Sequence, residues 1–198
     1  MTKEEFHKLW TITYPDTVPI SHFFKHNYSD RWFRIHSLPE SKRYAYNDRE
    51  WEILLKRQNE IITDLFETDT SILIVTGKYD LKGDEDINNL TDEEEVFKTY
   101  SFTQLDNIDL YELNSDSYEE GQIYRPAFAK TVWLLNQHDK LLREIANDNI
   151  RAFFVSFEKN VIVAPYDGGI DFVLKNNFTR DFYKNKYKQW LSELESGL

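Results

Sequence analysis

The chain has 198 residues, a formal net charge of −11 and no cysteine. The missing cysteines exclude disulfides, thiolate nucleophiles and cysteine-ligated zinc. The negative charge argues against nucleic acid as a main partner, because binding to a phosphate backbone needs an extended basic surface. No apolar stretch reaches the length of a signal peptide or a membrane span. We therefore expect a cytoplasmic protein with neither a membrane nor a nucleic acid as partner.

The N-terminal residues predict a short helix. Thr2 and Glu5 have the spacing of a capping box, and Phe6, Leu9 and Trp10 share one helical face. Pro residues at positions 15 and 19 end this pattern.

Helical and strand patterns then mix without a strict βαβ rhythm. Asn47 and Glu50 have the spacing of a helix cap, and apolar residues recur at helical intervals after them. In chain order we expect a short helix over 20–26, a strand over 31–36, a turn over 37–41, a helix over 47–66, a strand over 71–79, an ambiguous region over 96–134, a helix over 136–147 with Asn136 as its N-cap, strands over 152–157, 161–165 and 170–174, and a helix over 178–194. The last three strands read as a meander. The pattern predicts an α+β fold, a single domain over 1–198 with helices packed on a mainly antiparallel or mixed sheet.

Several familiar catalytic and metal-binding patterns are absent or incomplete. None of the six glycines belongs to a GxGxxG, P-loop or GxSxG motif. Acidic residues over 84–95 have the spacing of an EF-hand loop, but the strand-like sequence before them favours a solvated loop. His22 and His26 have the i, i+4 spacing of a metal pair without a third ligand, which favours a structural role. We expect no cofactor and no metal.

The positive charges form two basic tracts. Residues 31–44 sum to +3 and residues 175–190 to +4, so the rest of the chain carries −18. A strand over 31–36 puts Arg34 and His36 on one face, and the turn at Pro39 returns the following cations to the same end. Arginine forks suit phosphate or carboxylate, so the tract predicts a small-anion site. Its candidate residues are Arg31, Arg34, Ser37, Lys42, Arg43 and Tyr44, with His36 as a weak acid/base candidate. The alternative, which we favour, is a structural hub in which these arginines pair with acidic residues elsewhere.

A second concentrated segment spans residues 166–171. Its residues are Tyr166, Asp167, Gly168, Gly169 and Asp171. The structural interpretation is a glycine turn between strands in which Asp167 bonds local backbone amides. The functional interpretation makes Asp167 and Asp171 acid/base or metal-binding carboxylates, with Asp167 as a partner of the anion site; we favour the structural interpretation.

Three stretches carry a resemblance to a known family. RWFRIHSLPESKRY (31–44), APYDGGID (164–171) and WLSELESGL (190–198) resemble motifs of a family of small bacterial cytosolic proteins of unknown function. The family pattern reads R-x-H-S-L-P-x-S-K-R-Y, P-Y-D-G-G and W-L-S-x-x-x-x-G-L. The resemblance implies a bacterial cytosolic setting and supplies no catalytic residue. Ala164 departs from the pattern, which has His before the Pro.

Two functions remain open. The first is a non-enzymatic binding or regulatory protein, immunity-like in kind, that offers an acidic, aromatic-rich surface to a protein partner with a basic surface. The alternative is an enzyme or sensor that acts on a small phosphate- or carboxylate-bearing ligand at the anion site. The absence of a recognised catalytic pattern favours the first.

Overall fold

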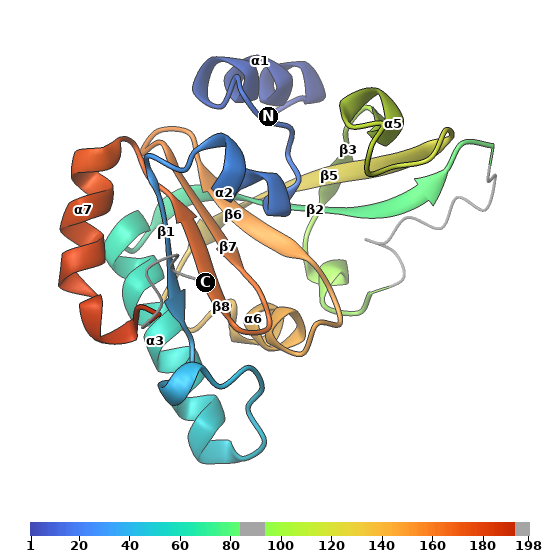
Figure 1. Ribbon diagram of the computed structural model, residues 1–198. Helices are drawn as coiled ribbons and strands as arrows, with labels where there is room; N and C mark the ends of the chain where they lie inside the picture. The colour runs from blue at the N-terminus through green and yellow to red at the C-terminus, as the bar shows by residue number, and fades with distance from the viewer. Residues whose placement is uncertain (84–93, 193–198) are drawn as a thin grey trace.

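The computed structural model describes residues 1–83 and 94–192. Within these residues eight strands form one antiparallel sheet in the order β1-β8-β7-β6-β2-β5-β3, and β4 pairs with β5 beside this path (Figure 1). The strands are β1 (Trp32–His36), β2 (Thr70–Leu81), β3 (Phe102–Gln104), β4 (Ile108–Asp109), β5 (Gln122–Trp133), β6 (Ala152–Ser156), β7 (Val161–Pro165) and β8 (Gly169–Val173). The helices are α1 (Lys3–Thr13), α2 (Phe24–Asn27), α3 (Asp48–Phe66), α5 (Leu110–Leu113), α6 (Asp139–Ala146) and α7 (Asn177–Lys186). The predicted α+β class is confirmed.

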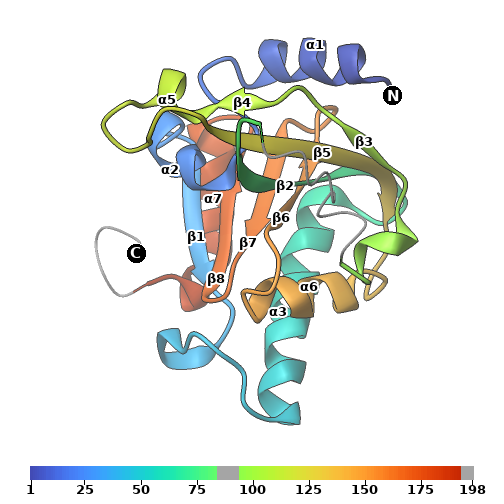
Figure 2. The same cartoon turned by 90° about the vertical axis from the view of Figure 1, so that its right-hand side faces the viewer.

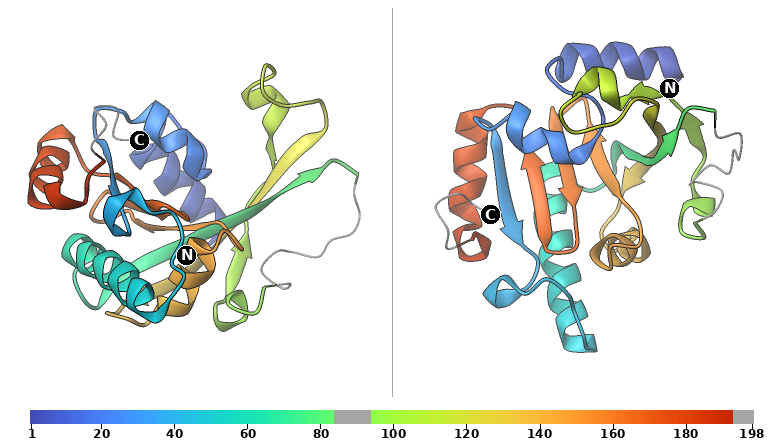
Figure 3. Two further views of the ribbon diagram at one scale, coloured as in Figure 1. Left: turned by 60° about the horizontal axis from the view of Figure 1, so that its bottom comes forward. Right: turned by 45° about the vertical axis from the view of Figure 1, so that its right-hand side comes forward.

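Helices cover both faces of the sheet, as Figure 3 shows. On one face α3 and α6 lie side by side (Figure 2) and bury residues such as Ile62 and Leu142 against Phe154 of β6. On the other face Phe6 and Trp10 of α1 pack with α2 against the opposite side of the same strands. The strands β6, β7 and β8 are covered on both faces, and every residue of these strands is buried. Their sequences are accordingly almost continuously apolar.

The two longest strands extend past the rest of the sheet. β2 and β5 pair over twelve residues each and carry β4 and α5 at their far end (Figure 1). The close approach of Tyr124 requires Gly77 at this point, because a Cβ at residue 77 would lie 2.5 Å from the Tyr124 ring. This extension forms one wall of the site described below.

Two predicted helix boundaries are wrong. Asn136 is not an N-cap: it adopts φ = 65° in a turn, and its backbone N–H donates to Asn59 on α3, so the helix begins at Asp139. The last helix ends at Lys186 instead of continuing to 194, and a short 3-10 turn, Lys188–Trp190, follows it. The predicted helix over 20–26 is a 3-10 turn, Ser21–Phe23, that leads into α2.

The EF-hand-like spacing falls mainly on residues 84–93, which lie outside the described part of the chain. In the described part, no three His, Asp or Glu side chains form a group that could hold a metal ion. No helix there combines the length and the apolarity needed to cross a membrane.

Candidate functional site

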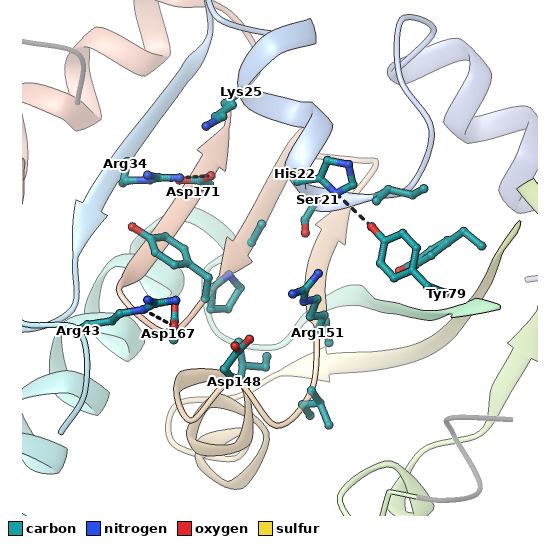
Figure 4. Close-up of a pocket in the computed structure, with 18 residues that line it drawn as sticks. Ser21, His22, Lys25, Arg34, Arg43, Tyr79, Asp148, Arg151, Asp167 and Asp171 are labelled. Atoms are coloured by element: carbon teal, nitrogen blue, oxygen red, sulfur yellow. Dashed lines mark hydrogen bonds and ion pairs between the residues drawn. The ribbon is translucent and has the colours of Figure 1, made fainter. Parts of the chain in front are cut away.

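A cavity of about 300 Å³ opens on the face of the sheet that α1 and α2 only partly cover. The register of the sheet places Arg34, Asp171 and Ala164 in one row across β1, β8 and β7, and all three line the cavity. Ala164 contributes a small side chain to the floor of the cavity. Figure 4 shows His22 and Tyr79 on the opposite side of the cavity from the Arg34–Asp171 pair, with Arg151 and Asp148 lower in the picture.

Arg34 and Asp171 form the best-enclosed ion pair of the cavity. Arg34 donates from Nε to Oδ1 at 2.5 Å and from Nη2 to Oδ2 at 2.9 Å, a bidentate geometry that arginine favours with carboxylates. Burial lowers the pKa of Arg34, but the bonds to Asp171 outweigh it and the pKa is raised overall. The guanidinium also lies 4.6 Å from the centre of the Tyr166 ring, whose own burial raises the pKa of its hydroxyl to about 12. Arg34 is therefore positively charged, and the carboxylate of Asp171 already balances this charge.

Arg43 and Tyr44 converge on Asp167 from the loop after β1. The Arg43 side chain bonds the Asp167 carboxylate directly, and the Tyr44 hydroxyl donates to the same carboxylate at 2.8 Å. The Asp167 side chain is only 8% exposed, whereas that of Arg43 is 63% exposed. The two predicted segments, 31–44 and 166–171, are thus held together by two ion pairs.

The other residues proposed for the anion site lie outside the cavity lining. Arg31 stacks on Tyr28 at 4.1 Å, and Ser37 is buried and accepts a bond from Gln58 at 2.9 Å. Lys42 pairs with Glu50 at 2.5 Å.

The weak acid/base candidate His36 also does not line the cavity. Desolvation and the nearby charge of Arg34 lower its pKa, so it is neutral at pH 7. The two glycines of the turn are structural. A Cβ on Gly169 would lie 2.0 Å from the carbonyl oxygen of Ile35, and one on Gly168 would lie 2.8 Å from the Tyr166 ring. Whether the predicted residues bind an anion stays a prediction.

Two further cations face the cavity without a carboxylate. Lys25 comes from α2 and Arg151 from the residue before β6. Neither makes an ion pair within 4 Å to any residue of the described ranges 1–83 and 94–192. Sequence reasoning missed both, because each is an isolated cation outside any motif.

His22 lies at the rim, held between two tyrosines. The Tyr79 hydroxyl is 3.2 Å from Nδ1, and the Tyr118 hydroxyl is 3.1 Å from Nε2. Desolvation lowers the pKa of His22, and the charges of Arg151 and Lys25 lower it further. His22 is therefore neutral at pH 7, with its two nitrogens in opposite roles toward the two hydroxyls. His26 lies at a different hollow, so the two histidines do not face a common metal.

Comparison with known proteins gives a family and no activity. Residues 20–195 match the family described as Domain of unknown function (DUF3885). The chain belongs to this family. The predicted membership in a family of unknown function is thereby confirmed, and the matched region contains every residue that lines the cavity. No curated protein and no solved structure matches the chain.

Proposed function

We propose that this DUF3885 protein binds a small phosphate- or carboxylate-bearing ligand in the cavity, as a binding or sensor protein. One observation carries the proposal: Lys25 and Arg151 face the hollow with no carboxylate within 4 Å among the described residues, while the neighbouring Arg34 and Arg43 are paired. In a chain of net charge −11 with many carboxylates available, two cations without a carboxylate partner around one hollow favour an external anion.

The electrostatics of the lining agree with this proposal. The cavity wall holds four Lys and Arg side chains against three aspartates, so its formal charge is +1 although the whole chain is strongly acidic. Walls of low dielectric strengthen the attraction between an enclosed anion and these cations. Arg151 offers a planar fork and Lys25 a point charge, two modes by which proteins bind phosphate.

Calorimetric titration with inorganic phosphate and with citrate tests the proposal. A bound anion should also raise the melting temperature, because a ligand at 100 times its Kd stabilises the folded state by about 2.7 kcal/mol. Arg151→Gln and Lys25→Gln should each weaken binding. Lys130→Gln removes one exposed positive charge outside the cavity and should leave the affinity unchanged. Absence of heat and of thermal shift with phosphate, with citrate and with phosphorylated organic compounds such as ribose 5-phosphate and phosphoserine would contradict the proposal.

The hypothesis of a basic protein partner receives less support. It rests on exposed tyrosine and tryptophan residues in an acidic surface. No tryptophan of the described chain is exposed, and the two most exposed tyrosines, Tyr46 and Tyr111, lie on separate elements, before α3 and on α5. The two most exposed phenylalanines, Phe178 and Phe182, lie on α7, inside the basic tract 175–190. The small anion is therefore the better candidate.

A further inference from the structure

The cavity also contains a carboxylate without a partner. Asp148 follows α6 in the left-handed conformation, φ = 58°, which Asp and Asn tolerate better than most residues. Its side chain lines the cavity and makes no hydrogen bond or ion pair to the rest of the described residues. The negative charge of Asp148 interacts electrostatically with Arg43 and Tyr44. The side chains of both residues bond Asp167. Asp148 therefore remains available to a ligand.

This carboxylate changes what kind of anion fits. A simple inorganic anion would satisfy Arg151 but would be repelled by Asp148, which Figure 4 shows close to Arg151, whereas Lys25 lies at the other end of the cavity, beside Asp171. A ligand that carries hydroxyl groups beside its anionic group satisfies both Arg151 and Asp148, because a carboxylate is a pure acceptor and adjacent hydroxyls are donors. An ammonium group would also bind Asp148, but it would lie beside Arg43 and Arg151, which repel it.

We propose that the ligand is a phosphorylated sugar, whose phosphate binds Arg151 and whose hydroxyls donate to Asp148. This inference rests on the proposed anion-binding function and adds the chemical class of the ligand. The partly exposed Tyr79 ring at the far wall provides an apolar surface for the carbon skeleton.

Titration of wild-type protein with three compounds tests the class of ligand: inorganic phosphate, ribose 5-phosphate and phosphoserine. A hydrogen bond to a charged group contributes about 1.5–3 kcal/mol, so ribose 5-phosphate should bind at least about tenfold more tightly than inorganic phosphate. Asp148→Asn should abolish this advantage while leaving the affinity for inorganic phosphate equal or higher. Asn tolerates the same backbone conformation, so the variant should fold, and circular dichroism checks this. The matched control Asp116→Asn changes an exposed aspartate outside the cavity and should keep the advantage.

The outcomes separate the two proposals. Binding of inorganic phosphate with no advantage for ribose 5-phosphate would overturn the sugar assignment and keep the anion site. An advantage for phosphoserine instead would assign Asp148 to an ammonium group and overturn the sugar assignment as well. Equal weakening of all ligands in Asp148→Asn would also count against it. If none of the three compounds binds the wild-type protein, the proposed function fails, and the inference fails with it.

Discussion

The ion pair between Arg34 and Asp171 tests why an acidic chain concentrates arginines in residues 31–44. In Asp171→Asn the guanidinium keeps its place over Tyr166 but loses its counter-charge. The two side chains are only 15% and 12% exposed. Removing one partner of a buried pair costs about 3–5 kcal/mol; because some contact with water remains here, we expect a loss of about 3 kcal/mol. For a chain of this length that corresponds to a fall of about 6–12 °C in melting temperature.

Urea unfolding at pH 7, followed by tryptophan fluorescence, measures this loss in Arg34→Gln, Asp171→Asn and the double variant. The double variant should lose clearly less than the two single losses added together, because it leaves neither member of this pair as a charge without its partner. Glu95→Gln is the matched control, since Glu95 forms an exposed pair with Lys98 and its loss should leave the melting temperature unchanged. A loss below about 1 kcal/mol in Asp171→Asn, the value of a surface pair, would refute the reasoning.

The same variants separate the hub from the anion site. If Arg34 is itself the ligand-binding group, freeing it from Asp171 should tighten phosphate binding markedly. If the pair is structural, phosphate affinity should respond to Arg151→Gln and change little in a folded Arg34→Gln protein. We expect the second result, because the bidentate bond already occupies Nε and Nη2 of Arg34.

Further predictions concern packing and pH. Gly169→Ala should lower the free energy of unfolding by at least about 2 kcal/mol, because the new Cβ would collide with the Ile35 carbonyl and push β1 away from β8. Urea unfolding measures this loss, and a smaller loss would mean that the two strands adjust freely. Leu142→Ala, at a fully buried position of α6, should cost about 2–5 kcal/mol in the same assay, and a loss under 1 kcal/mol would contradict the packing against α3. His22 has a folded-state pKa below its usual value near 6.5, so its contribution to stability is present above pH 6.5 and is lost as the pH falls through the folded pKa. His22→Gln should therefore lose less stability than wild type between pH 7.5 and pH 5. A bound sulfate beside His22 would raise this pKa, so calorimetry should show tighter sulfate binding in wild type as the pH falls and a weaker pH dependence in the variant.

Local sequence signals predicted the elements whose stability is decided locally. The helix over 48–66 begins where Asn47 was expected to cap it, and the Asn47 side chain accepts from the Glu50 backbone N–H at 3.0 Å. The capping box of Thr2 and Glu5 is likewise present. Asn136 failed as a cap because a contact with Asn59, 77 residues away, holds it in a turn, and no local pattern carries that information.

The candidate site was only partly predictable for the same reason. The tracts 31–44 and 166–171 stand out in the sequence and contact each other in the structure, but that Arg34 faces Asp171 depends on the register of β1 against β8, a non-local pairing. Lys25, Asp148 and Arg151 each stand alone in the sequence, and they meet only because the sheet and two loops surround one hollow.

Two arginines of the basic tract 31–44 bind the chain's own carboxylates. Arg34 and Arg43 attach β1 and the following loop to Asp171 and Asp167, and these bonds fix one wall of the cavity. The cations that remain for an anion come from other elements, Lys25 and Arg151. Substitutions within 31–44 should therefore act mainly on stability, whereas substitutions at 25 and 151 should act mainly on affinity. In an acidic chain this division follows from electrostatics: a dense basic tract attracts the chain's own carboxylates, and only isolated cations on the wall of a hollow stay available to an external anion.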